Sequence, residues 1–334
     1  MNLNGKNVLL LSPNFFEYSD NIKNELIALG ANVQRFNERI SDKPIMKAII
    51  RKRLHFLIYP LINSYYKKIL NEVENINFDY IFVINPEVIN NKIFSKLCHD
   101  NKSVKTILYL WDSINNKPHF KELFSLFDEK WSFDKNDCQK NKNLKFLPLF
   151  FDSSYIPVSE NNVQLEYDLC FIGTVHSDRF AIVSSLQSQA KKLGLKVYVF
   201  MYLPSKLMFF YKKCLDRGFF NVKYSDLSFK PLTEDQIINI LAKSKAVIDI
   251  NHNLQTGLTS RTFETLASKK KLLTTNLSIV DYDFYDKNNI DIIDRDNPIL
   301  KSDFLESEHN DNMTPLISNY SINNWIIEIF KNNN

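Results

Sequence analysis

The chain has 334 residues, 44% of them hydrophobic, with 42 Lys and Arg against 38 Asp and Glu and a formal net charge of +4. This hydrophobic fraction excludes a largely disordered chain, and the near balance of charges excludes a protein that grips a nucleic-acid backbone along its length. The length is generous for one hydrophobic core and sufficient for two.

The first half of the chain alternates apolar runs with segments of helical character. Short apolar runs predict strands at 7–11, 32–36, 80–84, 105–110, 129–133 and 145–149. Helices are expected at 19–29, with Ser19 as N-cap and Gly30 as stop, at 44–73 with an interruption at Pro60, and at 88–99. This order is typical of a parallel sheet and predicts an α/β domain over 1–150, on the acceptor side of the protein.

A second alternation follows a stretch rich in Ser and Asn, 151–166, which we interpret as a linker. Strands are predicted at 167–172, 196–201, 246–250 and 271–274, and helices at 179–192, 205–216, 233–243 and 260–268. We expect a second Rossmann-like domain over 167–320 and a C-terminal helix over 321–334 that can cross back to the first domain. Ligands of such sheets bind at the carboxyl ends of the strands.

The segment from Gly257 to Glu264 follows a predicted strand and opens a helix at Ser260. The N–H groups at a helix N-terminus suit a diphosphate, and Arg261 adds a planar cationic donor there. Glu264, one turn further on, can accept hydrogen bonds from a ribose. An ordinary capped helix with a solvated Arg and Glu is an equal alternative. The donor-binding candidates in this segment are Gly257, Thr259, Ser260, Arg261, Thr262 and Glu264.

A second candidate donor segment begins at Gly173 and Thr174, directly after the strand at 167–172. A glycine at this place lets the backbone approach a phosphate closely, and Arg179 begins the next helix. The alternative is a plain turn with Arg179 exposed. His176 lies on the same loop, where a surface position is the more usual interpretation of a lone histidine. His252, two residues after the strand at 246–250, and Asn251 are candidates for a catalytic base or a sugar contact.

In the first half, Trp111 and Asp112 end a predicted strand. A carboxylate there can activate an acceptor hydroxyl if the reaction inverts the sugar's configuration. A helix N-cap before Pro118 is an equal alternative for Asp112. Asn14 and Glu17, on the first loop, and Trp111 are the acceptor-side candidates.

The stretch GLTSRTFETLASKKKLLTTN, residues 257–276, resembles the donor-binding segment of GT-B glycosyltransferases, particularly the CgeB-like group and related capsule and lipopolysaccharide glycosyltransferases. The segments YLWDS, SFDKND and LPLFFD, which begin at residues 109, 132 and 147, are similar to the same group. The resemblance places Glu264 at the second Glu of the family's Glu-x7-Glu motif, which holds the ribose. The first Glu falls on Thr256, where the chain departs from the pattern.

The resemblance implies two Rossmann-like domains whose parallel sheets face a central cleft. It also implies transfer of a sugar from a nucleotide-sugar donor to a surface glycan of a capsule, O-antigen or lipopolysaccharide, without a cofactor. No metal is expected, and the D-x-D form of Asp281 and Asp283 is interpreted as chance in an Asp-rich tail. The same fold also supports a nucleotide-sugar epimerase, or a non-catalytic partner in a glycan-assembly complex.

The spacing of the cysteines and the hydropathy of the chain predict where in the cell the protein lies. The four cysteines lie far apart, which predicts neither a zinc site nor a disulfide framework and favours the cytoplasm. No apolar run approaches the roughly 20 residues of a membrane span. The basic stretch 45–70 mixes Lys and Arg with apolar residues. It predicts either peripheral contact with the inner face of the cytoplasmic membrane or a helix packed on the sheet with a solvated basic face.

Overall fold

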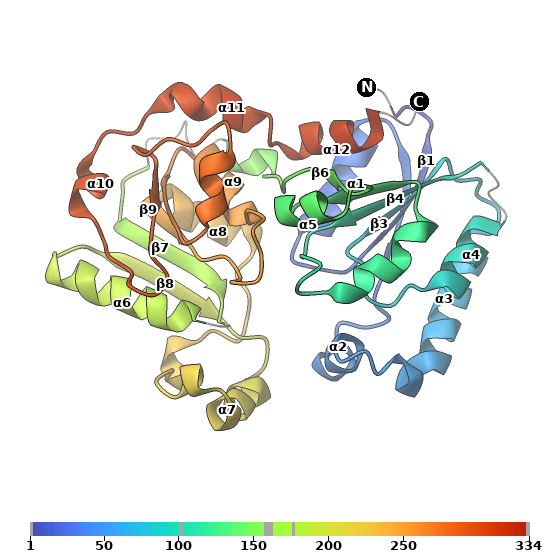
Figure 1. Ribbon diagram of the computed structural model, residues 1–334, viewed down its shortest axis with the longest axis horizontal. Helices are drawn as coiled ribbons and strands as arrows, with labels where there is room; N and C mark the ends of the chain where they lie inside the picture. The colour runs from blue at the N-terminus through green and yellow to red at the C-terminus, as the bar shows by residue number, and fades with distance from the viewer. Residues whose placement is uncertain (1–2, 100–102, 157–162, 176–177, 332–334) are drawn as a thin grey trace. The chain divides into compact units, whose positions relative to one another are not determined.

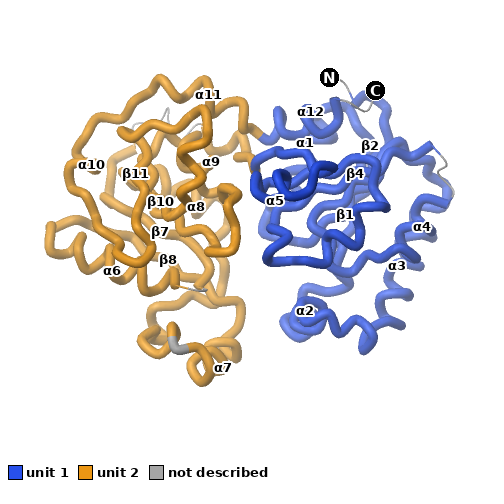
Figure 2. The backbone as a smooth tube through the Cα atoms, in the orientation of Figure 1, with its two compact units in different colours: residues 1–148, 322–334 blue, residues 149–321 orange. Residues whose placement is uncertain are grey.

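The computed structural model describes residues 3–99, 103–156, 163–175 and 178–331. The chain divides into two compact units, each with its own sheet (Figure 2). Unit 1 comprises Met1–Pro148 and Ile322–Asn334, and unit 2 comprises Leu149–Ser321.

The sheet of unit 1 has six parallel strands in the order β2-β1-β3-β4-β5-β6 (Figure 1). Its strands are β1 (Asn7–Ser12), β2 (Asn32–Asn37), β3 (Tyr80–Ile84), β4 (Lys105–Leu110), β5 (Glu129–Ser132) and β6 (Lys145–Phe146). All six lie where the apolar runs predict them. β3 is buried along its whole length, as is typical of a parallel strand covered on both faces.

Helices of unit 1 flank these strands. They are α1 (Tyr18–Ala28), α2 (Pro44–Arg51), α3 (Tyr59–Val73), α4 (Asn91–His99), α5 (Lys135–Lys140) and α12 (Ile322–Phe330), with short 3-10 helices η1 (His55–Ile58) and η2 (Pro118–Leu126). α3 begins at Tyr59, which places Pro60 in the first turn of the helix, where proline is tolerated. Along the described residues, no helix is long and apolar enough to cross a membrane.

The ends of α1 confirm one sequence prediction and correct another. Gly30 adopts φ +94°, the left-handed conformation that ends a helix, as predicted. Ser19 as N-cap was wrong, because the helix begins one residue earlier and Glu17 holds the N-cap position. The buried Ser19 hydroxyl instead donates to the Pro13 carbonyl at 2.9 Å, which ties the first turn of α1 to the loop after β1.

α12 packs against strands of unit 1, although it follows unit 2 in the chain. Its Trp325 ring contacts the rings of Phe82 and Tyr109, and its Phe330 ring contacts those of Tyr80 and Phe82. The chain therefore leaves unit 1 after Pro148, forms unit 2 and returns to complete the core of unit 1.

Unit 2 has a five-stranded parallel sheet in the order β11-β10-β9-β7-β8. Its strands are β7 (Tyr167–Thr174), β8 (Val197–Tyr202), β9 (Ser244–Asp249), β10 (Lys271–Thr274) and β11 (Ile290–Ile292). Four of them were predicted. β11 was not, because three residues are too few to show a pattern.

The helices of unit 2 are α6 (Arg179–Lys192), α7 (Lys206–Leu215), α8 (Glu234–Ala242), α9 (Ser260–Ala267), α10 (Ser302–Glu306) and α11 (Thr314–Ser318), with 3-10 helices η3 (Ser153–Tyr155), η5 (Arg217–Phe219), η6 (Tyr224–Asp226), η7 (Leu277–Asp281) and η8 (Asp311–Met313). Thr233 caps α8 as predicted and forms a capping box with Gln236. One face of the sheet, which includes Leu169 and Phe171, packs against α6 and α10.

Part of the predicted linker at 151–166 is packed in unit 2. Phe151 donates its N–H to the Tyr320 carbonyl at 3.1 Å, and the Tyr155 carbonyl accepts from the Ser268 hydroxyl at 3.3 Å. Residues 157–162 lie outside the described residues.

Candidate functional site

Arg179 lies at the carboxyl edge of the sheet in unit 2, at the start of α6. Its Nε donates to the Ile250 carbonyl at 2.8 Å and its Nη1 to the Thr174 carbonyl at 3.2 Å. A Cβ on Gly173 would lie 3.4 Å from this Nη1 and 2.9 Å from the buried Phe171 ring. The glycine therefore leaves the room that the Phe171 ring needs, while the guanidinium stays at contact distance. The structure brings the predicted residues Gly173, Thr174 and Arg179 together.

Arg295 joins this edge and was not predicted from the sequence. Its Nη1 donates to both carboxylate oxygens of Asp178, at 2.7 and 2.8 Å. Its Nη2 donates to the carbonyl and Oδ1 of Asn251, at 2.7 and 2.8 Å, and to the Thr275 hydroxyl at 3.1 Å. Arg295 thus links the residue before α6 to the ends of β9 and β10. It follows the unpredicted strand β11, so no local pattern pointed to it.

The two guanidinium groups differ in their partners, because Arg295 is paired with the Asp178 carboxylate. Within the described part of the chain, Arg179 forms hydrogen bonds only to neutral oxygen atoms. Burial lowers the pKa of Arg179 to about 10, the Asp249 carboxylate opposes this shift, and the nearby Arg295 guanidinium adds to it. Arg179 still remains charged at neutral pH. A half-buried cation whose hydrogen bonds go to neutral oxygens is suited to bind an anion.

The loop between β9 and α9 is fixed by side chains of the predicted donor segment. The Asp249 carboxylate, at the end of β9, accepts from the hydroxyls of Thr259 and Thr262 at 2.7 and 2.8 Å. The Asn276 amide donates to the carbonyls of Thr256 and Gly257, each at 3.1 Å. Thr259, Thr262 and Gly257 therefore hold the loop against the sheet, and their contact with a donor stays a prediction.

Arg261 and Glu264 pair with each other on α9. Arg261 Nη1 lies 2.7 Å from Glu264 Oε2, and the Glu264 side chain is only 1% exposed. The pair neutralises both charges within unit 2. Ser260, the first residue of α9, is half-buried. The predicted contacts of Ser260 and Arg261 with a diphosphate, and of Glu264 with a ribose, stay predictions.

Of the two histidines that the sequence analysis names near this edge, the structure describes His252. His252 follows β9, and its Nδ1 accepts from the Leu254 N–H at 3.3 Å. His176 lies outside the described residues. His252 therefore sits at the same sheet edge as Arg179, and its catalytic role stays a prediction.

In unit 1, Asp112 lies just beyond the carboxyl end of β4 and is half-buried. Its Oδ1 accepts from the Asn116 amide at 2.7 Å, and its Oδ2 lies 3.2 Å from Lys117 Nζ. The alternative interpretation of Asp112 as a helix N-cap is wrong, because Lys117 holds the N-cap position of η2. Asp112 is therefore a carboxylate placed by an ion pair at the edge where a parallel sheet binds ligands.

The ion pair between Asp112 and Lys117 belongs to a larger network of charged side chains in unit 1. Lys117 Nζ also lies 2.5 Å from Glu87 Oε1, and Glu87 Oε2 accepts from Arg39 Nε at 2.5 Å. Burial raises the pKa of Glu87, but the Arg39 hydrogen bond and the Lys117 charge outweigh it and lower this pKa to about 2. The chain of alternating charges holds Lys117 beside Asp112.

The predicted acceptor-side residues lie on two loops of unit 1. Asn14 is held by Asp42 and by Arg35, whose Nη2 donates to Asn14 Oδ1 at 2.5 Å. Glu17 is exposed at the N-cap position of α1. The Trp111 ring centroid lies 6.0 Å from that of the exposed Phe15. Phe15 and Trp111 place exposed aromatic surface near Asp112.

The loop that carries Asp112 is anchored by α5. Asp134 caps this helix by accepting from the N–H groups of Asn136 and Asp137. Asp137 Oδ2 accepts from the Ile114 N–H at 2.7 Å, two residues beyond Asp112. Burial raises the pKa of Asp137 to about 6, the Ile114 N–H opposes this, and the Asp134 charge adds to it.

Replacing Asp137 with Asn is expected to raise the free energy of unfolding at neutral pH by about 3 kcal/mol. The folded pKa of about 6 exceeds the usual value of 3.8, so the folded state favours the protonated acid. The wild type therefore loses stability as the pH rises between these two values, and the amide does not. Urea unfolding of both proteins across this pH range measures the difference. A difference that stays constant with pH contradicts the raised pKa.

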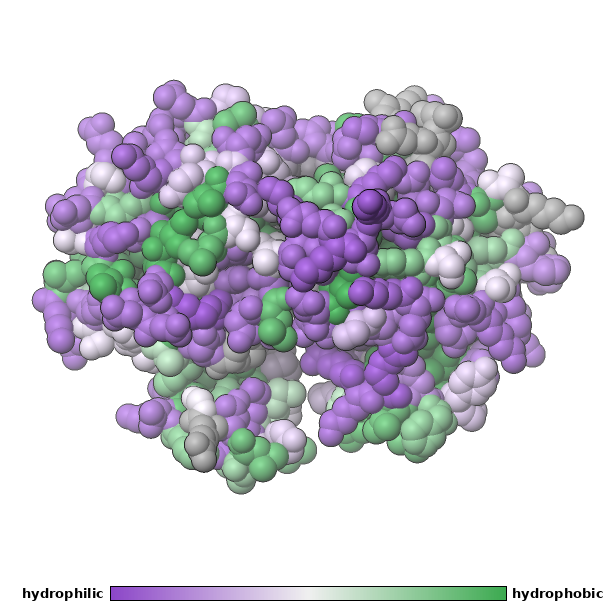
Figure 3. Space-filling view, in the orientation of Figure 1, coloured by the Kyte–Doolittle hydropathy of each residue, from purple (hydrophilic) through white to green (hydrophobic). Residues whose placement is uncertain are grey.

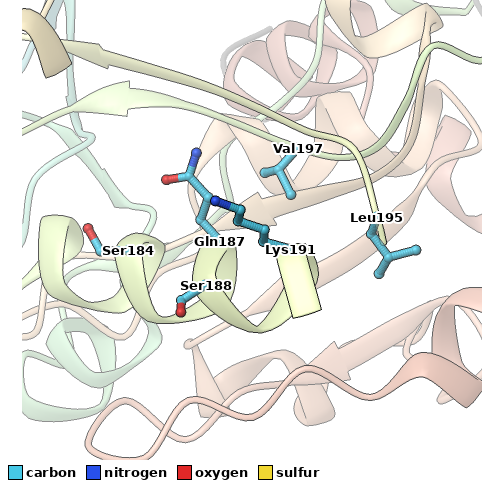
Figure 4. Close-up of a pocket in the computed structure, with 6 residues that line it drawn as sticks. All are labelled: Ser184, Gln187, Ser188, Lys191, Leu195 and Val197. Atoms are coloured by element: carbon cyan, nitrogen blue, oxygen red, sulfur yellow. The ribbon is translucent and has the colours of Figure 1, made fainter. Parts of the chain in front are cut away.

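A surface hollow in unit 2 lies away from these residues. It is lined by four residues of α6, Ser184, Gln187, Ser188 and Lys191, and by Leu195 and Val197 (Figure 4). Val197 begins β8, so the hollow lies at the amino end of that strand. The Arg179 cluster lies at carboxyl ends, and the hollow contributes nothing to it.

Metal-binding side chains do not gather in the described part of the chain, where no group of three or more His, Cys, Asp or Glu residues could hold an ion. In the D-x-D segment, Asp283 Oδ1 accepts from the Tyr320 hydroxyl at 2.7 Å.

Comparison with known proteins identifies the fold. No family model matches the sequence, and no curated protein matches it. Among solved structures, the lipopolysaccharide outer core galactosyltransferase WaaB has a TM-score of 0.54 at 12% identity, covering 98% of both chains. Anabaena HepE in complex with UDP-glucose has a TM-score of 0.57 at 12% identity, also covering 98% of both.

The UDP-GlcNAc 2-epimerase of Methanocaldococcus jannaschii has a TM-score of 0.53 at 9% identity, covering 98% of this chain and 99% of that one. Likenesses at such identities show the fold alone. The two Rossmann-like units with parallel sheets are those of a GT-B fold, which confirms the fold expected from the resemblance to GT-B glycosyltransferases.

Proposed function

We propose that the protein is a glycosyltransferase that moves a sugar from a nucleotide-sugar donor to a surface glycan. The observation that carries this proposal is the pair Arg179 and Arg295 at the carboxyl edge of unit 2. A departing nucleoside diphosphate gains negative charge in the transition state. Two guanidinium groups fixed at this edge of the sheet, one of them bonded to Thr174, stabilise that charge without reorganising.

The ligands and names of structures with the same fold support a choice of substrates. HepE is bound to UDP-glucose, so UDP-sugars are the first donors to test. WaaB is a lipopolysaccharide galactosyltransferase, so lipopolysaccharide, O-antigen and capsule glycans are the acceptors that we propose.

On the acceptor side, we assign the general base to Asp112 and the second candidate base to His252. Asp112 combines a carboxylate at a strand end with the aromatic rings of Trp111 and Phe15. Aromatic rings bind the apolar faces of sugars, and a carboxylate can take the proton of a sugar hydroxyl. This arrangement suits an inverting transfer, consistent with Thr256 at the position of the family's first Glu.

The basic stretch 45–70 packs one face on unit 1, as one of the two interpretations of the sequence predicts, and membrane contact of its outer face is a proposal. Ile50, Ile58, Ile62, Tyr66 and Ile69 pack into the core of unit 1, so one face lies on the protein. Other apolar side chains of the stretch are exposed: Ile45, Phe56, Leu57 and Leu61. Residues 43–68 contain seven Lys and Arg and no Asp or Glu. We propose that this outer face contacts the anionic inner surface of the membrane, where a lipid-linked acceptor lies.

Release of nucleoside diphosphate from a panel of nucleotide sugars is expected to require a glycan acceptor. UDP-glucose, UDP-galactose and UDP-N-acetylglucosamine are tested with and without lipopolysaccharide and capsule fragments, and released UDP is measured. Release without acceptor, together with a changed sugar, supports the epimerase alternative. Tight UDP binding without any release supports a non-catalytic partner. Failure to bind any nucleotide overturns both enzyme assignments.

A further inference from the structure

α7 in unit 2 presents its apolar face outward. Leu207, Phe210, Tyr211 and Leu215 are 78%, 59%, 61% and 67% exposed. They stand at positions i, i+3, i+4 and i+8, which lie on one side of a helix. Phe209, on another side, is buried in the core of the unit. A helix in water normally turns such a stripe inward, so this stripe indicates a binding surface.

The segment that follows α7 in the chain carries further exposed aromatic side chains. Phe220 and Tyr224 are also exposed. We call the six side chains the α7 surface: Leu207, Phe210, Tyr211, Leu215, Phe220 and Tyr224. In the space-filling view, hydrophobic side chains gather on the exposed surface over α7 (Figure 3).

The charges around the α7 surface are almost all positive. Residues 206–230 contain six Lys and Arg against two Asp, whereas the whole chain has a formal net charge of only +4. One of the acids, Asp216, is paired with Lys212 at 3.3 Å. Lys212 Nζ also lies 4.6 Å from the Phe219 ring centroid. Apolar side chains surrounded by lysines complement an anionic lipid surface.

The α7 surface is tied to the edge of the sheet that holds the candidate donor site. The segment leaves β8 at its carboxyl end, after Tyr202. It returns where Ser228 donates its N–H to the Met201 carbonyl at 2.8 Å and accepts from the Leu203 N–H at 2.9 Å. Because β8 is parallel to β7, this is the edge at which Arg179 lies.

We propose that the α7 surface docks unit 2 on an anionic lipid bilayer. The helix lies in the plane of the interface, with Leu207, Phe210 and Leu215 at the boundary of the acyl chains and the lysines among the headgroups. The bilayer then lies against a segment that begins and ends at the sheet edge where Arg179 lies. This proposal concerns binding alone, so it stands or falls independently of sugar transfer.

Flotation with lipid vesicles tests the proposal. The full chain is mixed with vesicles of phosphatidylcholine and phosphatidylglycerol, or of phosphatidylcholine alone. The test variant is Leu207→Ser/Phe210→Ser/Leu215→Ser, and the matched control is Leu277→Ser/Val280→Ser, at two exposed apolar residues elsewhere in unit 2. Both are also examined in an Ile45→Ser/Phe56→Ser/Leu61→Ser background, which removes the contribution of unit 1. Thermal unfolding confirms that every variant is folded.

The test variant is expected to lower partitioning onto the anionic vesicles at least about tenfold, because three apolar side chains lose their burial. The control is expected to bind like the wild type, and all proteins are expected to bind phosphatidylcholine alone more weakly. Test-variant binding equal to wild type overturns the proposal, as does equal binding of the wild type to both vesicles. Sedimentation of the wild type as a dimer that the test variant dissociates assigns the surface to a second copy instead.

Discussion

Replacing Arg179 with Ala is expected to weaken binding of the nucleotide-sugar donor roughly 100-fold, since hydrogen bonds between charged groups contribute about 1.5–3 kcal/mol. Arg179 is the cation at this edge whose hydrogen bonds, within the described residues, go only to neutral oxygens. Arg295, by contrast, already pairs with Asp178. The charge of Arg179 is therefore the one most available to a diphosphate.

Titration calorimetry with UDP and with UDP-glucose measures this loss. Arg179→Lys is expected to recover part of the affinity, because it keeps the charge but loses the planar fork of donors. Arg53→Ala is the matched control, since Arg53 lies in unit 1 and its partner is the exposed Glu122. If Arg179→Ala binds UDP as tightly as the wild type, the donor site does not lie at this edge.

Replacing Asp112 with Asn is expected to lower kcat by a factor of about 10² to 10⁴, the usual contribution of a general base. The amide can still accept the hydrogen bond from Asn116, but it cannot take up the proton of an acceptor hydroxyl. Donor binding is expected to stay unchanged, because the proposed donor contacts all belong to unit 2. The loss therefore separates a role in chemistry from a role in binding.

Steady-state kinetics with donor and acceptor varied in turn measure the effect of Asp112→Asn. Glu122→Gln, at an exposed carboxylate of the same unit, is the matched control. An unchanged kcat in Asp112→Asn removes Asp112 from the chemistry. His252 in unit 2 is then the remaining candidate for the general base.

The fold was predictable because its strands carry local signals. β3 and β4 are short apolar runs bounded by polar residues, and burial on both faces of a parallel sheet requires such runs. Gly30 marked the end of α1 by its conformational freedom. β11 could not be predicted, because its three residues are held by pairing with β10 and carry no periodicity of their own.

The site was predictable only in part, because its interactions join distant residues. Gly173 and Arg179 are only six residues apart in the chain, so their spacing could associate them. Arg295 reaches partners at 178, 251 and 275, and no local pattern contains that information.

The threonines illustrate the same limit. Thr259 and Thr262 have the hydroxyls expected of a phosphate-binding loop. In the folded unit these hydroxyls donate to Asp249, which precedes them by ten and thirteen residues. Sequence spacing alone does not distinguish an internal acceptor of these hydroxyls from an external one.

The return of α12 to unit 1 has a consequence for how the protein is made. A ribosome delivers the chain from its first residue onward, and domains generally fold as they emerge. Unit 2, residues 149–321, is complete before α12 has been synthesised. Synthesis of unit 1 begins first, but its core is complete only when the rings of Trp325 and Phe330 pack against Phe82. During synthesis, the earlier half of the protein is therefore the later one to close its core, and its exposed strands are the surface that chaperones would meet.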